Sequence, residues 1–407
     1  MKRVLFALVL AAIQMLPALP ASAGESAARK NANAKTPQDG EAEARLIAVY
    51  QLVGQARGRE ALRAAEKLVR DHPNFQLAQL AYGDLLASQA RPIRSFGDVP
   101  DTTANAAGPV LADLREESRM RLKALRERPV PGTIPSQFLS LSPQNRHAIA
   151  VDASRSRLYL FENSRTGLRL VADYYISLGS SGIEKNVEGD LRTPLGVYFI
   201  TSNLDPRSLK DFYGAGALPI NYPNALDTKR GKTGSGIWLH GTPPNQFARG
   251  PNATNGCVVL ANPDLDRILR TVSVRTTPVV IASRLQWVAP HSVAADSKTF
   301  EDALHAWRNA KTAGDMTRVL RFYTPDFRSY NKTLAEWTPS LRSELDKIRG
   351  RNLQLKDVSY LRWTDSSDTM VVTFGEVADG SRTGPTKRQY WLRQDGQWKI
   401  FFEGVIG

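Results

Sequence analysis

Two side chains whose types allow acyl-transfer chemistry, His240 and Cys257, lie 17 residues apart in the sequence. Cys257 is the only cysteine in the 407-residue chain, so it cannot form a disulfide within that chain. A cysteine thiolate is a nucleophile, and a nearby histidine is a common base for producing it. Because Gly256 leaves the backbone free for a close approach to a substrate carbonyl, we expect the amides of Gly256 and Cys257 to form an oxyanion hole. A buried structural cysteine is the alternative that these residues alone leave open.

Three motifs stand in a fixed order around this pair: RTPLGVY at 192–198, IWLHGT at 237–242 and TNGCVV at 254–259. Together they resemble the YkuD-type L,D-transpeptidase family over about residues 146–283. The resemblance implies a β-rich catalytic fold in the bacterial envelope that acts on peptidoglycan stem peptides. It implies that Cys257 attacks the carbonyl of the third stem residue, that His240 is the base, and that an amine resolves the thioester.

Two positions depart from the family pattern. Asn255 stands where the family usually has histidine, and Val259 stands where it often has arginine. A branch of the family with such departures uses water instead of an amine and trims tetrapeptides to tripeptides as an L,D-carboxypeptidase. Three functions therefore stay open: an L,D-transpeptidase, an L,D-carboxypeptidase and a wall-binding scaffold without catalysis. The acyl acceptor is equally open among another stem peptide, a free D-amino acid and an envelope protein.

Further residues near the motifs are candidates for binding the substrate: Tyr222, Asn224, Gly241, Thr254 and Asn255. Ordinary turn chemistry is the alternative for Tyr222 and Asn224. We expect a backbone carbonyl near Thr254 or Gly256 to orient the imidazole. The other histidines match no motif and are interpreted as structural or surface residues: His72, His147, His291 and His305. The chain has no metalloprotease motif and no second cysteine, so we expect neither a metal nor another cofactor.

The first 128 residues divide into three segments. Residues 1–23 read as a signal peptide, because Lys2 and Arg3 precede a short apolar run and a small-residue cleavage site. Export to the periplasm follows from this interpretation. Residues 24–40 are polar and predicted to be a disordered leader. Residues 41–128 have helical periodicity, with a loop at 95–110 and a helix at 111–126. Residues 64–86 resemble part of a tetratricopeptide-type helical hairpin. The interpretation that we favour is a small helical packing or dimerisation module, which would allow a homodimer.

The remainder is predicted to hold two β-rich units, which makes the fold class multidomain. Residues 146–285 form the catalytic domain, with strands at 148–151, 157–161, 169–176, 195–201, 236–240, 257–260 and 278–282. Asn262 is predicted to be the N-cap of the helix that follows it. Residues 296–407 place helices before strands, which indicates an α+β unit. The runs 388–391 and 396–400 give this unit a resemblance to nuclear-transport-factor-2-like (NTF2-like) domains, which implies a binding or dimerisation role.

The charge balance is basic, with 54 Lys and Arg against 40 Asp and Glu. Such a surface favours anionic polymers, which outside the cytoplasm are those of the wall. No cluster of basic residues is interleaved with aromatic residues, and no zinc-finger spacing occurs. We therefore expect no nucleic-acid partner.

Overall fold

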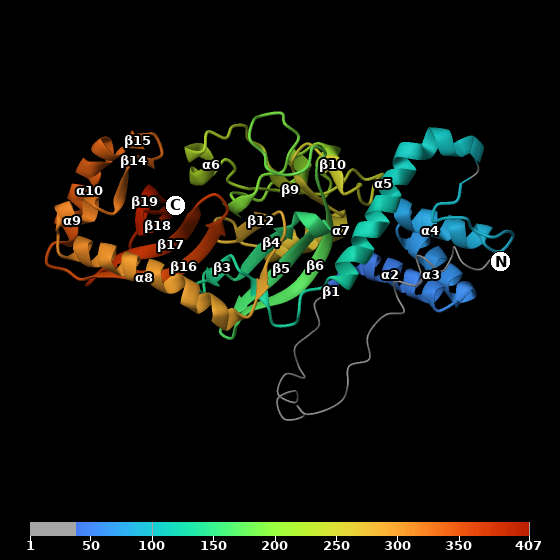
Figure 1. Cartoon of the computed structure of the whole chain (residues 1–407), viewed down its shortest axis with the longest axis horizontal. Coiled ribbons are helices and arrows are strands. Elements are labelled where there is room, and N and C mark those ends of the chain that lie inside the picture. The colour runs from blue at the N-terminus through green and yellow to red at the C-terminus, as the bar shows by residue number, and fades with distance from the viewer. Residues whose placement is uncertain (1–37, 100, 407) are drawn as a thin grey trace, which may run out of the picture.

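The computed structural model describes residues 38–99 and 101–406, so the predicted signal peptide and most of the predicted leader lie outside the described residues. Three units follow one another along the molecule, with a helical module at one end, a central β-rich domain, and a C-terminal domain at the other end (Figure 1). This arrangement is the multidomain layout that the sequence predicts. In the described part of the chain, no helix has the length and apolar character needed to cross a membrane.

The helical module contains α2 (Glu41–Gly54), α3 (Gly58–Asp71), α4 (Gln76–Ala87) and α5 (Asp101–Arg126). Its buried apolar side chains recur at helical spacing, as in Leu46 and Val49 of α2. The loop predicted at 95–110 is shorter than expected, because α5 already begins at Asp101 and contains Pro109. An alanine-rich start favours this longer helix in spite of the proline.

The end of the predicted leader is also ordered. Gln38–Asp39 forms β1, which pairs in parallel with β6 of the central domain. The expectation of disorder up to residue 40 is therefore wrong for its last residues. Ladder hydrogen bonds to a buried strand outweigh the polar composition of this short segment.

The central domain is built on one large sheet in the order β7-β12-β4-β5-β6-β11-β9-β8, with β1 and β10 also paired to β6. The strand bounds are β4 (His147–Asp152), β5 (Arg157–Ser164), β6 (Gly167–Gly179), β7 (Gly196–Phe199), β8 (Ala217–Pro219), β9 (Trp238–His240), β10 (Asn252–Thr254), β11 (Val258–Leu260) and β12 (Pro278–Ala282). Each strand predicted between residues 148 and 282 is present, including the β4–β5 hairpin. One hydrophobic core lies on one face of the sheet and includes Ile149, Leu239 and Val258. A second lies on the other face, where Ala150 and Tyr159 pack together with residues of the C-terminal domain. The helices α6 (Ala225–Lys229) and α7 (Asn262–Thr271) belong to the same domain.

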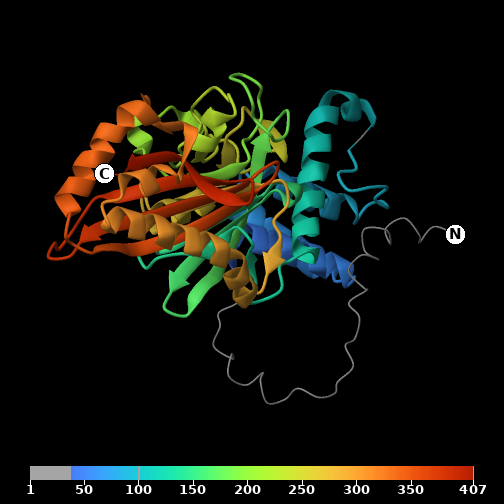
Figure 2. The same cartoon turned by 60° about the vertical axis from the view of Figure 1, so that its left-hand side comes forward.

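The C-terminal domain has helices on one face of a curved sheet whose order is β15-β14-β19-β18-β17-β16-β3. The helices are α8 (Pro290–Thr312), α9 (Met316–Leu320) and α10 (Leu334–Ile348). The strands are β14 (Tyr323–Ser329), β15 (Lys332–Thr333), β16 (Leu353–Thr364), β17 (Asp368–Ala378), β18 (Thr386–Gln394) and β19 (Gln397–Val405). The long helix α8 runs across the sheet, as the turned view shows (Figure 2).

The linker before the central domain joins the two β-rich units. Phe138–Ser140 forms β3 and adds an edge strand to the C-terminal sheet by pairing with β16. Ile134–Pro135 (β2) pairs with Trp287–Val288 (β13) in a separate ribbon. This stretch was not predicted as strand, because its partners lie far away in the sequence and its own pattern is too short to read.

Candidate active site

The predicted catalytic pair, His240 and Cys257, is positioned by two neighbouring parallel strands. In the register of β9 and β11, Leu239 lies opposite Val258, and both belong to the hydrophobic core. Since side chains alternate along a strand, His240 points away from that core. Cys257 directly precedes β11, and continuing the same alternation places it on the face of His240. The sheet therefore brings to one face two residues that the sequence only placed 17 positions apart.

The turn before Cys257 is fixed by Gly256 and Thr193. Gly256 has a φ of 115°, and a Cβ there would lie 2.6 Å from the Arg192 carbonyl oxygen. Only glycine fits this combination of positive φ and close backbone approach. The Thr193 hydroxyl donates to the Gly256 carbonyl at 3.0 Å. The RTPLG motif thus holds the nucleophile turn in place.

Thr254 organises the same turn from its other side. Its hydroxyl donates to the Cys257 carbonyl at 2.8 Å and accepts from the Gly256 amide at 3.1 Å. Thr254 is buried, so the structure gives it a positioning role instead of the expected substrate contact. The expectation that the amides of Gly256 and Cys257 together form the oxyanion hole is also wrong. The Gly256 amide is already bonded within the turn, which leaves the Cys257 amide as the candidate donor.

His240 is oriented by the residue that follows it. Its Nδ1 lies 2.7 Å from the Gly241 carbonyl oxygen, so the expected carbonyl near Thr254 or Gly256 is the wrong one. The nitrogen hydrogen-bonded to a carbonyl carries the proton, which leaves Nε2 as the basic nitrogen. His240 is 1% exposed. Burial lowers the pKa of His240 to about 4, opposed by the Gly241 carbonyl. The imidazole is therefore neutral at physiological pH and able to accept a proton.

Gly241 is required by packing as well as by its carbonyl. A Cβ at Gly241 would lie 2.0 Å from Oδ1 of Asn262. That oxygen accepts from the amides of Ala215 and Thr242 at 2.9 and 3.2 Å. Asn262 therefore fixes the loop that follows His240. It is the first residue of α7, and the N-cap position that was predicted for Asn262 is occupied by Ala261. Gly241 holds the imidazole, and its expected substrate role stays a prediction.

Cys257 is partly exposed and makes one long contact to the Gly236 carbonyl, at 3.5 Å. Burial raises the pKa of the Cys257 thiol, whereas the Trp238 amide and the positive charges of Arg249 and Lys185 oppose the rise. The thiol and the imidazole are thus both neutral at rest. In such a pair the histidine must take the thiol proton during the attack.

Arg249 is a residue of this site that the sequence motifs did not reveal. Its guanidinium stacks on the Phe212 ring at 4.6 Å, and its charge acts on both Cys257 and His240. Among the described residues no carboxylate pairs with it, so its charge is free to stabilise a thiolate or a substrate carboxylate. Arg249 thus supplies a positive charge near Cys257, which the uncharged Val259 cannot provide. No pattern in the sequence links Arg249 to Cys257, because the loop that carries it is placed by tertiary packing.

Aromatic rings frame the imidazole on its other sides. Tyr213 meets the His240 ring edge-on at a centroid distance of 5.1 Å, and Phe212 lies 5.7 Å from it. Tyr213 also lies 4.9 Å from the Trp238 ring. These rings keep water away from the imidazole, consistent with its lowered pKa.

Two predicted substrate ligands have structural roles instead. Asn224 is buried and caps α6, accepting from the amides of Leu226 and Asp227 and donating to the Val197 carbonyl. Its hydrogen-bonding groups are therefore occupied, as the turn-chemistry alternative requires. Tyr222 is buried too, and its hydroxyl donates to the Thr233 carbonyl at 3.1 Å. Asn255 is exposed beside the nucleophile turn, and its substrate contact stays a prediction.

The remaining histidines take no part in the site. His72 lies against the Phe247 ring in the helical module, and His147 is a half-buried residue of β4. His291 and His305 are exposed on α8. No group of three or more His, Cys, Asp or Glu side chains that could hold a metal ion occurs within residues 38–99 and 101–406.

Comparison with known families identifies both β-rich domains. The family model of the YkuD L,D-transpeptidase catalytic domain matches residues 146–281. The model of the Cds6 C-terminal NTF2-like domain matches residues 299–404. The chain therefore contains a YkuD L,D-transpeptidase catalytic domain followed by a C-terminal NTF2-like domain, which confirms both resemblances.

Solved structures share this layout. Bd1075 from Bdellovibrio bacteriovorus is 23% identical, with 67% of this chain and 98% of that chain covered and a TM-score of 0.56. The helical cell shape determining protein Pgp2 from Campylobacter jejuni is 21% identical, with 70% and 98% covered and a TM-score of 0.52. At these identities the likeness is one of fold. No curated protein matches the chain.

Proposed function

We propose that this protein is a peptidoglycan L,D-transpeptidase that cleaves the bond between residues 3 and 4 of a stem peptide through a Cys257 thioester. The observation that carries the proposal is the placement of Cys257 and His240 on one face of the β9–β11 pair, with Nδ1 of His240 fixed by the Gly241 carbonyl. A non-catalytic scaffold has no need of both the fixed imidazole and the partly exposed thiol. The family match supports the same class of chemistry.

The first half-reaction follows from this geometry. Nε2 of His240 takes the thiol proton while the sulfur of Cys257 bonds to the carbonyl carbon of the third stem residue. The Cys257 amide is positioned to donate to the oxyanion. The bond to the fourth residue then breaks, and His240 returns the proton to the leaving amine. Arg249 stabilises the negative charge that develops on sulfur as the proton moves to His240.

In the second half-reaction an amine attacks the thioester. His240 accepts the amine proton, a new amide bond forms, and the thiol is regenerated with that proton. The acceptor is a second stem peptide, a free D-amino acid or an amine of an envelope protein. We place the reaction in the periplasm, since residues 1–23 read as a signal peptide and the basic surface suits the anionic wall.

Hydrolysis of the same thioester is a second candidate. The neutral imidazole can deprotonate water as well as an amine, and the uncharged Asn255 and Val259 match the departures seen in the trimming branch of the family. An L,D-carboxypeptidase would release a tripeptide and no exchanged product.

Incubation with purified tetrapeptide muropeptides, followed by mass spectrometry, tests these alternatives. Cross-linked or amine-exchanged products support the transpeptidase, and tripeptides alone support the carboxypeptidase. Cys257→Ser and His240→Gln should each lose at least about 1,000-fold in turnover. Arg207→Ala, a change at an 89% exposed side chain, is the matched control. Turnover that persists in Cys257→Ser would refute the proposal.

A further inference from the structure

A cavity of about 850 Å³ lies between the catalytic domain and the C-terminal domain. It is bounded by β7 and the start of α6 on one side and by β14, β18 and β19 on the other. Small-molecule sites have volumes of roughly 300–1,000 Å³ and often lie between domains. The size and position of this cavity are therefore those of a binding site.

The cavity is strongly basic. Four basic side chains line it against one acidic side chain: Lys229, Arg275, Arg328, Arg388 and Asp326. The carboxylate of Asp326 is already paired with Lys229. The charge left to a ligand is thus positive.

Arg388 is the buried member of this set, at 8% exposed. Its Nε donates to the Thr373 hydroxyl at 3.0 Å, and an Nη donates to the Arg275 carbonyl at 3.3 Å. The guanidinium also stacks on the Phe199 ring at 3.1 Å. No carboxylate of the described residues pairs with it, and burial lowers the pKa of Arg388 to about 10. A buried cation without a counter-charge is costly, and an anionic ligand would remove that cost.

A second buried polar group lines the same cavity. Tyr390 is 2% exposed, and its hydroxyl has only the Asn221 side chain beside it, without hydrogen-bond geometry. Buried hydroxyls are normally paired. Arg388 and Tyr390 are near neighbours on β18, so one ligand could satisfy both.

An aromatic wall completes the cavity. Tyr330 is 67% exposed and has a positive φ of 51°, a conformation that costs a bulky residue energy. It is held there by a hydrogen bond from its hydroxyl to the Val405 carbonyl and by edge-on packing against Phe402. A Cβ at Gly404 would lie 2.9 Å from that hydroxyl, so the glycine makes room for it. An exposed ring kept in a strained position offers a flat surface to a ligand.

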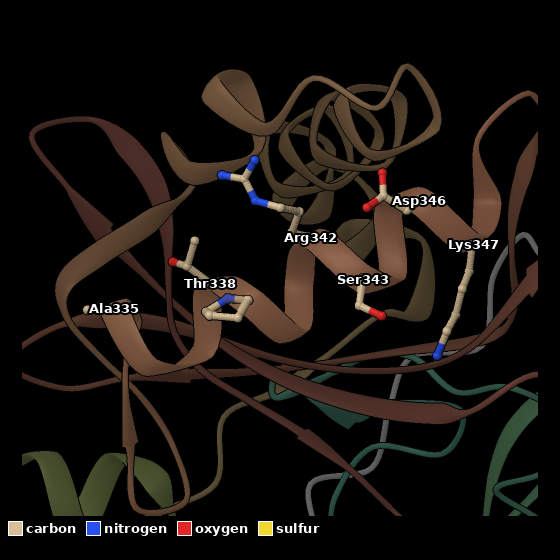
Figure 3. A pocket seen from close by; sticks show the side chains of 7 residues that line it. Ala335, Thr338, Arg342, Ser343, Asp346 and Lys347 are labelled. Atoms are coloured by element: carbon tan, nitrogen blue, oxygen red, sulfur yellow. The ribbon is translucent and has the colours of Figure 1, made fainter.

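A second hollow, on the surface of α10, lacks these features. It is lined by side chains of α10 alone, among them Ala335, Thr338 and Arg342, and most of these are exposed (Figure 3). It contains no buried polar side chain that lacks a partner. This comparison leaves the cavity between the two domains as the candidate site.

We propose that this cavity binds an acidic ligand that contains a ring, and that this ligand is a carboxylated sugar. Its acidic group would bind Arg388, and its ring would pack against Tyr330. Arg388 provides a fork of donors suited to a carboxylate or a phosphate. The Tyr390 hydroxyl adds a hydrogen bond, and Arg328 and Arg275 add attraction at the rim. This site is separate from Cys257 and His240, and the proposal does not depend on the proposed catalytic function.

Isothermal titration calorimetry on the purified protein tests the proposal with three probes: N-acetylmuramic acid, neutral N-acetylglucosamine and inorganic phosphate. We expect N-acetylmuramic acid to bind and N-acetylglucosamine not to bind. Arg388→Met should weaken that binding at least about tenfold, whereas Arg393→Met, an exposed arginine on the same strand, should leave it unchanged. If phosphate binds, N-acetylmuramic acid does not bind, and Arg388→Met abolishes the phosphate binding, the anion site is supported. The acidic group of its ligand is then a phosphate.

Two further variants separate ligand contacts from folding. Tyr390→Phe removes one hydroxyl and should weaken binding of either anion by a few fold. Tyr330→Ala should weaken binding of the sugar acid but not of phosphate. Thermal unfolding without ligand shows whether Arg388→Met is folded. The proposal is overturned if neither anion binds the unaltered protein, or if a folded Arg388→Met variant binds as tightly.

Discussion

The catalytic domain meets its neighbours at two junctions, and buried charge is treated differently at each. At the junction with the helical module, Glu43 of α2 forms ion pairs with Arg157 of β5 at 2.7 Å and with Arg121 of α5 at 3.0 Å. Arg157 also pairs with Asp173, and Arg121 with Glu117. All of these side chains are buried. Each cation has a carboxylate partner, so the network ties together the four elements α2, α5, β5 and β6.

At the junction with the C-terminal domain, the buried cation has no such partner. Arg388 stacks on Phe199 and bonds only to neutral oxygens of the protein. The ion pairs that do join these domains lie nearer the surface, as Arg230–Asp365 does. The apolar contact between the two domains supplies most of the remaining adhesion, through residues such as Phe199 and Phe401.

This difference separates buried charges that are paired within the fold from buried charges that are left without a counter-charge, which we propose to be ligand-binding. The buried network inside the C-terminal domain belongs with the first group, since Lys387 pairs there with Glu344, Glu376 and Glu403. Arg249 at the catalytic site belongs with the second. Loss of a paired buried charge should therefore unfold structure, whereas loss of an unpaired one should change binding or chemistry.

The largest expected effect comes from Arg157→Met. This change leaves Glu43 and Asp173 buried with fewer cations, and it should cost about 3–5 kcal/mol of unfolding free energy. Urea unfolding measures the loss. Arg169→Met, at an exposed arginine of the same sheet, should change stability by less than about 0.5 kcal/mol. Equal stability of the two variants would contradict the structural role of the network.

A smaller effect is expected from the pH dependence of the same junction. Burial, with Glu43 adding to it, raises the pKa of Asp264 to about 7. A carboxyl whose pKa is higher in the folded state loses stability as pH rises from its unfolded value towards 7. Asp264 should therefore contribute a loss on the order of 2 kcal/mol between pH 5 and pH 8, measured as the difference in unfolding free energy between the unaltered protein and Asp264→Asn. Asp264→Asn should lose less over this range, and an unchanged slope in denaturant midpoints would count against the raised pKa.

The unpaired arginine of the catalytic site should act on chemistry and not on stability. Arg249→Met should slow alkylation of Cys257 by iodoacetamide about fivefold at pH 7, because the thiolate loses a nearby positive charge. Arg249→Lys should recover much of the rate. In the unaltered protein the rate should rise throughout pH 6–9, since burial raises the thiol pKa. A rate independent of pH in that range would indicate a preformed thiolate and imidazolium pair.

The smallest effect is expected at the surface of the second junction. Arg230→Ala removes a bidentate pair to Asp365 at 2.7 Å between half-exposed side chains. It should cost about 0.5 kcal/mol at low salt and nothing measurable at 1 M NaCl, because salt screens exposed pairs. Chemical denaturation at both salt concentrations measures this. A loss as large as that of Arg157→Met would erase the contrast between the junctions.

Local patterns were sufficient to predict much of this fold. Alternating apolar runs predicted the strands of the central sheet, including the β4–β5 hairpin, because a strand with one buried face has a period of two. The helical module was readable in the same way. The strand β3 and the early start of α5 were not, since short segments take their structure from distant partners.

For the candidate active site, the sequence by itself predicted Cys257 as the nucleophile, His240 as the base and Gly256 as the glycine that the turn requires. These residue types are required by the chemistry and by local backbone conformation, so they leave motifs. Tertiary structure alone decided that Gly241 orients the imidazole, that Asn224 and Tyr222 are structural, and that Arg249 lies near Cys257. It also placed Arg388 against a cavity between domains. Charge compensation depends on which side chains packing brings together in space, and no spacing along the chain encodes that.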